Sequence, residues 1–570
     1  MTNLDLINGI APGDPSIICE DQLCFNGGAI LVLDHATLVM RHCDVRGQGP
    51  VGSGFAVADR GGGIRAQSIR AMSFDNVTFA NLCAMQGAVV SIHKQDDRSS
   101  TVDFVTAFDN CRFLGNYAIQ FAVVWVGDFN NVVYFYDCDF DNNEGSAFMN
   151  YQAEPDRTMG FMSRCNFWNN TMSSPDLIKF TGMSSGGGPV TSAGVGSEYT
   201  DCWFENNIGI TSPGGQGGAV GVFGGSFCTL TNCTFIGNVG YDGGAVAAVQ
   251  GSMTILRCYF RGNSAVYSAG DFYAENAEIT IINSTFTGTS AVNHAGFGHL
   301  VDSTLLAEHS VFSDASANYG PALIFTGSTG VVADCIVRDT FCKYNIGAFF
   351  LEAGSNVHIA RTRVQNNRVP NGPAAVVYAK SSSVTFEDCD IIDNLAKWNA
   401  AVFFGRNGGH MTFINSRMIG NTIVGGSTFY SGSVGYVDSA SSVRIVGGTI
   451  MNASGPEDLV KAAIYDESTV DFGVIMDSVV VDETITIFSN GSNVLLQNCV
   501  GFSSTAVAKA EVATCAATSD YCIPESCVDT SVGIDCSCEV DGVEIPFPTD
   551  CMQSAVIEAR RLSTASARLP

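Results

Sequence analysis

The chain has 570 residues, of which only 15% are charged and 62 are glycine, a composition that suits stacked strands with many tight turns. Acidic residues outnumber basic ones by 56 to 28, for a net charge of −28. This argues against nucleic acid or an anionic membrane surface as a partner, because both require a cationic protein surface. No apolar run reaches the roughly 18 residues expected of a transmembrane segment.

Residues 1–25 are interpreted as an N-terminal cap, in which Cys19 and Cys24 are spaced to close a loop. The segment that starts at Met1 has neither the basic start nor the apolar core of a signal peptide. Other features, described below, favour an extracellular or cell-surface location. We therefore expect the natural N-terminus to lie upstream of Met1.

A repeat occupies residues 26–510 and decides the fold class. Residues 357–367, 384–394 and 411–421 share the pattern apolar-x-apolar-x-[N/D/R]-[C/S/T]-x-apolar-x-x-Asn, and successive copies are 27 residues apart. The pattern predicts an all-β protein, a right-handed parallel β-helix of about sixteen turns. The middle residue of the copies falls at Cys43, Val77, Cys111, Cys138, Cys165, Cys202, Cys233, Cys258, Ser284, Ser310, Cys335, Thr362, Cys389 and Ser416, with weaker copies near Gly448, Ser478 and Cys499.

Each copy contains a corner between two inward-facing strands. Side chains alternate between the two faces of a strand, and in Phe386-x-x-Cys389-x-Ile391 the alternation slips by one residue. Both segments can face inward only if the chain turns there. The corner position often carries Asn or Asp, which tolerate left-handed backbone angles. These residues are Asn76, Asn110, Asp137, Asp201, Asn232, Asn283, Asp334, Asp388 and Asn415.

Two further features recur after the corner. Asparagines follow three residues after an inward aromatic residue, and stacked asparagine amides can hydrogen-bond from turn to turn, which predicts a structural ladder. A glycine pair then opens the next strand, at residues 217–220 and 243–246. The asparagines of the predicted ladder are Asn116, Asn143, Asn170, Asn207, Asn238 and Asn263.

The paired signatures Phe-x-x-Asn and Gly-Gly-Ala-[Ile/Leu/Val] resemble the repeats of the polymorphic outer membrane proteins of chlamydiae. The likeness is strong over residues 100–265 and looser to about residue 500. It implies a β-helical surface adhesin, although the membrane barrel of that family is missing here. The wider superfamily resembled is that of the pectate lyases and pectinases, whose Asn-Thr-Asp, Gly-His-Gly and Trp-Ile-Asp-His signatures are absent, so this likeness concerns the fold alone.

The cysteines fall into two classes. Those of the repeat alternate with Ser, Thr and Val at equivalent positions, as small core residues do. Residues 511–552 instead crowd six cysteines among polar, turn-rich neighbours, which predicts a small disulfide-stapled module and an oxidising compartment. Zinc is the alternative, but paired Cys-x-x-Cys motifs are missing. The six are Cys515, Cys522, Cys527, Cys536, Cys538 and Cys551; the tail at 553–570 carries no motif and is expected to be disordered.

No cofactor is expected, apart from a candidate Ca²⁺ site. Asp137, Asp139 and Asp141 point outward from one strand and corner, and three carboxylates in a row can hold Ca²⁺, although such a row is more often a solvated face. Glu387, Asp388, Asp390 and Asp393 form a similar cluster. Asn452 and Asn490 are the favoured glycosylation positions.

Two functions remain open at this stage. The first is a non-enzymatic cell-surface or extracellular protein that binds a glycan or protein partner. The second is a polysaccharide lyase or glycoside hydrolase with a diverged active site, whose acids would assemble from successive turns. Converging polar groups on one flank would favour the enzyme, whereas scattered polar residues would favour the binding protein.

Overall fold

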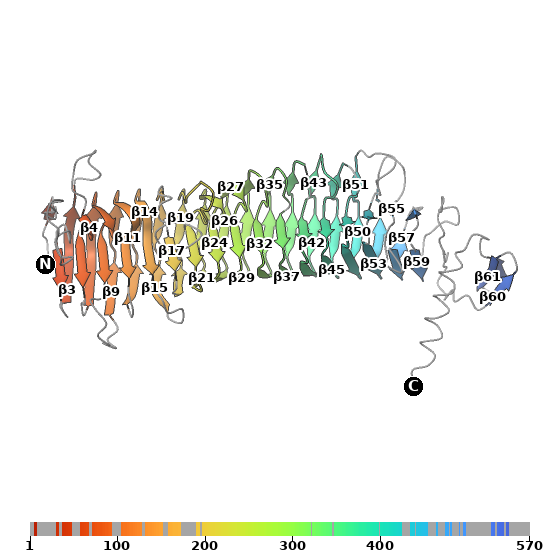
Figure 1. Ribbon diagram of the computed structural model, residues 1–570, viewed down its shortest axis with the longest axis horizontal. Coiled ribbons are helices and arrows are strands. Elements are labelled where there is room, and N and C mark those ends of the chain that lie inside the picture. The colour runs from red at the N-terminus through yellow and green to blue at the C-terminus, as the bar shows by residue number, and fades with distance from the viewer. Residues whose placement is uncertain are drawn as a thin grey trace, which may run out of the picture. The chain divides into compact units, whose positions relative to one another are not determined.

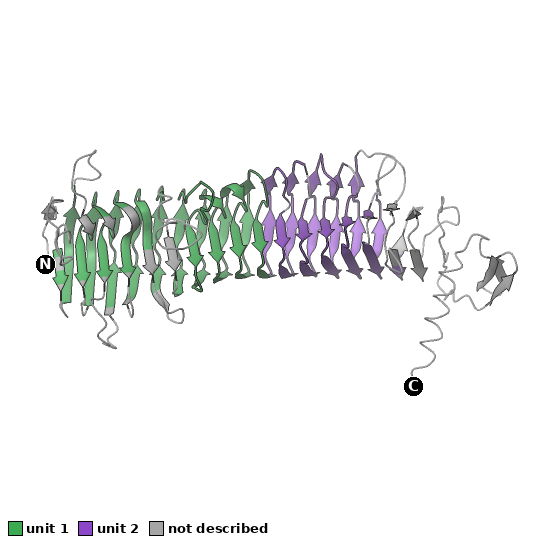
Figure 2. Cartoon of the chain, viewed as in Figure 1, with its two compact units in different colours: residues 1–306 green, residues 307–570 purple. Residues whose placement is uncertain are grey.

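In the computed structural model the chain divides into two compact units, residues 1–306 and 307–570, here called unit 1 and unit 2 (Figure 2). The residues described contain strands and no helix, so no helix that could span a membrane occurs among them. The described residues are 5–7, 30–33, 37–47, 58–67, 71–93, 104–127, 131–151, 158–172, 190–193, 196–320, 322–344, 347–397, 400–424, 434–438, 441–453, 463–465, 474–477, 479–481, 489–490, 494–497, 526–530, 533–540 and 543–546.

Each turn of unit 1 in the region of the candidate site consists of four short strands joined by tight corners (Figure 1). Each strand pairs in parallel with its counterpart one turn further along the chain. The strands of one turn are β25 (Ser252–Leu256), β26 (Tyr259–Arg261), β27 (Ser264–Ser268) and β28 (Phe272–Glu275). Their counterparts are β29 (Glu278–Ile282), β30 (Thr285–Thr287), β31 (Ser290–Ala291) and β32 (Gly298–Val301).

The corner between the first two strands of a turn lies where the repeat predicts it. All nine predicted Asn and Asp corner residues have φ between 50° and 55°. This left-handed region is costly for most L-residues, and Asn and Asp adopt it more readily. The predicted corner is therefore confirmed, and it lets both flanking strands face the core.

The glycine pairs are required for two different reasons. The first glycine of each pair, Gly217 or Gly243, has a φ of 78° or 72°, which a side chain would disfavour. The second lies against the next turn, and a Cβ on Gly218 would overlap the carbonyl oxygen of Gly244. Glycine here permits the close stacking of successive turns.

The core of unit 1 contains a continuous stack of phenylalanines, one from each turn. Phe204 is fully buried, and its ring centroid lies 4.8 Å from that of Phe167 and 4.5 Å from that of Phe235. The rings are nearly parallel, with interplanar angles of 4° and 2°. Such aromatic pairs add about 0.5–1.5 kcal/mol each beyond the area they bury. The stack therefore ties neighbouring turns together through their interior.

The [C/S/T] position of the repeat is a buried hydrogen-bond donor. The Cys165 thiol donates to the carbonyl oxygens of Phe135 and Ser163 at 3.5 and 3.4 Å, and the Ser284 hydroxyl makes the equivalent bonds in its own turn. A small side chain with one donor fits the site, which explains why Cys, Ser and Thr interchange. All cysteines whose side chains are described are free, and burial raises the pKa of the Cys165 thiol well above its usual range.

The asparagines after the phenylalanines form a hydrogen-bonded series in unit 1. The Asn143 amide donates to Asn170 Oδ1 at 2.9 Å, and the Asn170 amide donates to Asn207 Oδ1 at 3.0 Å. The same contact repeats through successive turns to Asn263. Asn263 then donates to Asp271 Oδ1 at 2.9 Å, so a buried carboxyl group accepts the last bond of the series.

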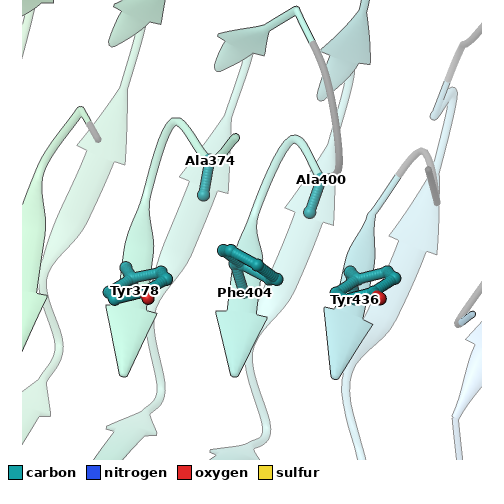
Figure 3. Packing of buried hydrophobic residues seen from close by; sticks show 5 residues of the cluster. All are labelled: Ala374, Tyr378, Ala400, Phe404 and Tyr436. Carbon is teal, nitrogen blue, oxygen red and sulfur yellow. The ribbon is translucent and has the colours of Figure 1, made fainter. Parts of the chain in front are cut away.

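Unit 2 repeats the same turn, with its own series from Asn367 through Asn394 to Asn421. On the outer face of its strands β40 (Phe349–Glu352), β44 (Val377–Lys380), β48 (Phe403–Arg406) and β52 (Gly435–Asp438), one position per strand is aromatic. Tyr378, Phe404 and Tyr436 pack there beneath Ala374 and Ala400 (Figure 3). An aromatic row under small side chains thus covers this face.

The ends of the repeat differ from the prediction. The solenoid has about 11 turns, fewer than the predicted sixteen or so, and single strands continue the parallel pairing near its C-terminal end, where β56 (Val474–Asp477) pairs with β59 (Val494–Gln497). Within the predicted cap, only β1 (Asp5–Ile7) is described, and it pairs in parallel with β3 (Thr37–Arg46). Within the predicted cysteine-rich module, β60 (Ser526–Thr530), β61 (Gly533–Val540) and β62 (Val543–Pro546) form an antiparallel sheet.

Candidate functional site

The outer face of unit 1 carries a column of residues in register on β24 (Val246–Val249), β28 and β32. Strands β24 and β32 are labelled in Figure 1. Phe272 and Ala274 of β28 are fully buried in the core, so the alternate residues Tyr273 and Glu275 face outward. Tyr273 pairs in register with Ala247 on one side and with His299 on the other. Adjacent turns thus bring Tyr273, Glu275 and His299 together.

A second row of polar residues lies on the preceding strand of each turn. Asp242, at the end of β23 (Val239–Asp242), pairs in register with Ser268. Isolated bridges extend the row from Asp242 to Gln216 and from Ser268 to His294. Because these four residues are spaced by 26 positions in the sequence, each turn of the solenoid contributes one of them.

Side-chain contacts join the two rows. The Ser268 hydroxyl lies 2.8 Å from Nδ1 of His299. The Tyr273 hydroxyl donates to Glu275 Oε2 at 3.1 Å, and the Tyr273 ring meets the His299 ring edge-on at 5.8 Å between centroids. We call the set formed by Gln216, Asp242, Ser268, Tyr273, Glu275 and His299 the polar site.

The electrostatics of the polar site reflect burial and two neighbouring carboxyl groups. Burial and the charge of Glu275 raise the pKa of Asp242 to about 7. Burial, with the Glu275 and Asp242 charges, raises the pKa of Tyr273, so its hydroxyl keeps its proton at neutral pH. Burial lowers the pKa of His299 to about 4, and the imidazole is therefore neutral at pH 7.

Two acceptor atoms of the polar site have no hydrogen-bond partner. Gln216 is only 6% exposed, and its Oε1 atom is buried and unpaired. Oδ1 of Asp242 is also buried and unpaired, although the carboxylate accepts a bond from the Ser268 backbone N–H. Unsatisfied buried acceptors are rare in proteins and each costs about 1–3 kcal/mol. Both atoms are closed off from solvent, so this cost falls on the stability of unit 1.

Unit 2 shows that the fold does not need these polar groups. At the outward position occupied by Tyr273 and His299 in unit 1, unit 2 has the aromatic row that includes Tyr378 and Phe404. On the covering segment it has Ala374 and Ala400, joined by a bridge. Alanines over aromatic rings make a satisfied apolar cover (Figure 3). The polar groups of unit 1 are thus additional to what stacking requires.

Aromatic residues border the polar site, and one of them is exposed. Tyr241, next to Asp242 in the chain, stacks on Tyr267 with 5.4 Å between ring centroids. Tyr267 is 40% exposed and meets the His294 ring edge-on at 5.5 Å. We call Tyr241, Tyr267 and His294 the aromatic ridge. It presents flat, partly apolar surfaces beside buried polar atoms, a combination typical of ligand sites.

The neighbourhood of the polar site is poor in basic residues. Over residues 196–306 the sequence has only Arg257 and Arg261 as cations, against Glu198, Asp201, Glu205, Asp242, Asp271, Glu275, Glu278 and Asp302 as acids. Neither arginine contributes to the shifted pKa of Asp242, Tyr273 or His299. A polyanionic ligand would find no neutralising cation among these contacts.

The candidate calcium ligands lie on one strand and corner but pair separately. Asp137 accepts two hydrogen bonds of 2.7 Å from Arg164, which holds the pKa of that carboxyl below its usual range. Asp139 accepts a bond from Asn166 at 2.8 Å, and Asp141 accepts one from Asn142 at 2.9 Å. Within the described residues, no group of three or more His, Cys, Asp or Glu side chains could hold a metal ion.

The second acidic cluster also pairs with cations or histidine. Glu387 lies 3.0 Å from Nε2 of His358, and Asp390 accepts a 2.7 Å bond from Arg417, which lowers the pKa of Asp390. Asp388 and Asp393 have positive φ and occupy turns. Charge pairing along successive turns accounts for this cluster.

Several predicted sites lie at or beyond the limits of the described residues. Cys19, Cys24, Cys515, Cys522 and Cys551 are outside them. The backbones of Cys527 and Cys536 are opposite one another in the antiparallel sheet, and Cys538 is on the same strand as Cys536; their side chains are outside the described part. Asn452 is exposed and Asn490 lies in β58 (Ser489–Asn490).

The polar site itself is missing from the sequence-based candidates. A signal was present, because Gln216, Asp242, Ser268 and His294 recur every 26 residues, on a segment of the turn where unit 2 carries Ala374 and Ala400. Comparing each offset between turns, rather than searching for catalytic motifs, would have revealed it.

Comparison with known proteins supports the fold. The family model described as "Right handed beta helix region" matches residues 272–450, in agreement with the parallel β-helix described above. Among solved structures, it is similar to PfbA, a surface adhesin of Streptococcus pneumoniae, with 10% identity, a TM-score of 0.30, and coverage of 78% of this chain and 91% of the adhesin. It is also similar to the PL6 family alginate lyase AlyGC, with 10% identity, a TM-score of 0.23, and coverage of 88% and 86% respectively. No curated protein matches the sequence.

Proposed function

We propose that this chain is an extracellular or cell-surface β-helix protein that binds a glycan at the polar site and aromatic ridge of unit 1, without catalysis. The observation that carries the proposal is the exchange of an apolar cover for hydrogen-bonding groups. Asp242 and Ser268 lie on the segments that precede β24 and β28, whereas the segments that precede β44 and β48 in unit 2 carry Ala374 and Ala400.

The chemistry of the two surfaces matches that of a sugar. A sugar ring has hydroxyl groups that need directional partners and C–H faces that pack on aromatic rings. The half-buried carboxylates and the Tyr273 hydroxyl meet the first need, and the stacked rings of Tyr241 and Tyr267, of which Tyr267 is exposed, meet the second. Because the polar groups come from successive turns, they are held on paired strands rather than on mobile loops.

An oxidising location fits the chain on two counts. The disulfide module predicted at 511–552 requires such a compartment. The free cysteines of the repeat tolerate it, because their burial keeps thiols protonated and therefore unreactive. An extracellular glycan or a glycoprotein is then the accessible partner.

A glycan array followed by calorimetric titration of the full chain tests the proposal. Tyr267→Ala should weaken binding about tenfold or more, since it removes one face of the aromatic ridge. Tyr136→Ala is the matched control, because Tyr136 is likewise an exposed, stacked tyrosine of unit 1, 37% accessible, and lies on β12 (Asn131–Tyr136), in a different sheet from β23 and β27. Equal affinities for the wild type and Tyr267→Ala would contradict the proposal.

A glycoside hydrolase is the second candidate, favoured by Asp242. A carboxyl group with a pKa of about 7 can donate a proton at neutral pH, and Glu275 is a nearby carboxylate. New reducing ends released from a neutral glycan, and lost in Asp242→Asn, would establish this activity. A polyuronate lyase is less suited to a site without cations; unsaturated product from polygalacturonate with Ca²⁺ would identify one.

A further inference from the structure

We propose that a second face of unit 1 binds a neutral β-1,4-linked polysaccharide, which lies along the direction in which the turns stack. This face belongs to a different sheet from the polar site and the aromatic ridge, so the inference goes beyond the proposed function. Its evidence is a column of outward side chains in which aromatic rings and threonines alternate from turn to turn. The column consists of Trp203, Thr234, Tyr259 and Thr285, here called the alternating strip.

The alternating strip occupies one outward position of the repeat. Its residues open the strands β19 (Trp203–Glu205), β22 (Thr234–Ile236), β26 and β30, of which β19 and β26 are labelled in Figure 1. Trp203 pairs in register with Thr234, which pairs in turn with Tyr259. The next residue of each strand is a fully buried phenylalanine, so the strip itself faces outward.

The two aromatic rings of the strip have the spacing of a two-sugar repeat. Trp203 and Tyr259 are each 38% exposed. They are two turns apart, which places their backbones about 9.5 Å from one another at the usual strand spacing. In a β-1,4-linked chain each hexose is rotated by half a turn relative to the last, so every second sugar presents the same face after a similar distance. Alternate sugars can therefore stack on Trp203 and Tyr259.

The stacking of the protein does not use the exposed faces of these rings. Within the described residues, neither Trp203 nor Tyr259 contacts another aromatic ring, because Thr234 separates them. The indole N–H of Trp203 donates to Glu205 Oε2 on the same strand at 2.9 Å, which restricts the orientation of the ring. Flat ring faces pack on the C–H faces of sugars, and the hydroxyl groups of Thr234 and Thr285 can bond to the sugars between.

The charge of this face matches a neutral polymer. The alternating strip carries no charged residue, and the other outward positions of its four strands carry one acid, Glu205, and one base, Arg261. The face is thus uncharged overall, in a chain whose net charge is −28. A polyuronate or a basic peptide would meet no net opposite charge here. A neutral polysaccharide gives up no such attraction.

Unit 2 shows that the fold does not require this alternation. At the same position of the repeat, unit 2 has Arg363, Asp390 and Arg417, which are in register on successive turns. Arg417 donates to Asp390 at 2.7 Å. Charged pairs therefore satisfy the position as a surface, and the aromatic and threonine side chains of unit 1 are additional to what the fold needs.

The experiment compares four neutral hexasaccharides by calorimetric titration of the full chain. Cellohexaose and chitohexaose have the β-1,4 linkage, whereas laminarihexaose and maltohexaose are glucose chains with other linkages. At least one of the first two should bind about tenfold or more tightly than both of the others, and the tighter of the pair identifies the sugar. The affinity should also rise steeply between the disaccharide and the trisaccharide of that sugar, because only the trisaccharide reaches both rings.

Substitutions locate the binding. Trp203→Ala and Tyr259→Ala should each weaken it about tenfold or more, and Tyr259→Ala should also remove the gain from disaccharide to trisaccharide. Tyr136→Ala is again the matched control, since this exposed tyrosine lies in the same sheet as the strip but outside it, and it should leave the affinity unchanged. Circular dichroism checks that each variant is folded.

The outcomes separate this inference from the proposed function. Equal affinity for the four hexasaccharides, or binding unchanged in both Trp203→Ala and Tyr259→Ala, overturns the inference. Binding that is lost in Tyr267→Ala and kept in Trp203→Ala also overturns it, because the glycan then lies on the aromatic ridge and the proposed function stands. Binding that is lost in Trp203→Ala and kept in Tyr267→Ala supports the alternating strip, whatever the polar site binds.

Discussion

Replacing Asn170 by leucine should destabilise unit 1 by about 3 kcal/mol. The Asn170 amide donates to the Phe140 carbonyl at 2.9 Å and to Asn207 Oδ1 at 3.0 Å. Its Oδ1 accepts from the backbone N–H and the side-chain amide of Asn143, at 3.1 and 2.9 Å. At about 1 kcal/mol per bond the loss is about 4 kcal/mol, and the burial of an apolar side chain returns about 1–2 kcal/mol of it.

Two measurements resolve the effect of Asn170→Leu. Equilibrium denaturation gives the change in unfolding free energy, and hydrogen exchange locates it, because the turns of a solenoid can open locally. Amides of the turns that contain Asn143 and Asn207 should exchange faster than those of distant turns. This pattern would show that the asparagine series transmits stability between neighbouring turns.

A matched substitution on the same turn is the control. Asn166 is half-buried on the outer side of β16 (Asn166–Trp168) and makes one side-chain bond, to Asp139 at 2.8 Å. Asn166→Leu should cost no more than about 0.5–1 kcal/mol. Equal losses for the two variants would refute the reasoning, because buried hydrogen bonds would then contribute no more than an exposed one.

Three further predictions concern the core. Phe204→Ala should cost about 3–5 kcal/mol in denaturant unfolding, because it leaves a cavity in the phenylalanine stack; a loss below 1 kcal/mol would show that the stack closes around it. Burial raises the pKa of Asp271 far above its usual range, so the folded protein keeps a proton that the unfolded chain loses. The free energy of unfolding should therefore fall as pH rises above about 4. Asp271→Asn should flatten this dependence of stability on pH. A thiol reagent should leave Cys165 unmodified in the native protein and label it after denaturation, as measured by mass spectrometry. The cysteines of residues 511–552, predicted to form disulfides, should react with the reagent only after reduction.

The sequence by itself determined the fold because the β-helix is built from local, repeated constraints. A corner needs a residue that tolerates positive φ, and Asn or Asp marks it in most copies, as at Asn76 and Asn110. Inward positions must be apolar or small with one donor, which fixes the alternation around Cys165 and Phe167. Each constraint acts within a few residues, so the sequence reveals it without knowledge of the neighbouring turn.

Only the tertiary structure decided the candidate site. Asp242, Ser268 and His299 are unremarkable singly, and none belongs to a known catalytic motif. Stacking brings residues 26 positions apart into register, and the covering segment then sets Ser268 against His299 at 2.8 Å. The raised pKa of Asp242 likewise follows from burial and from Glu275 on another strand. These properties depend on distances between turns and on the exclusion of water. Neither can be predicted from the order of residues in the chain.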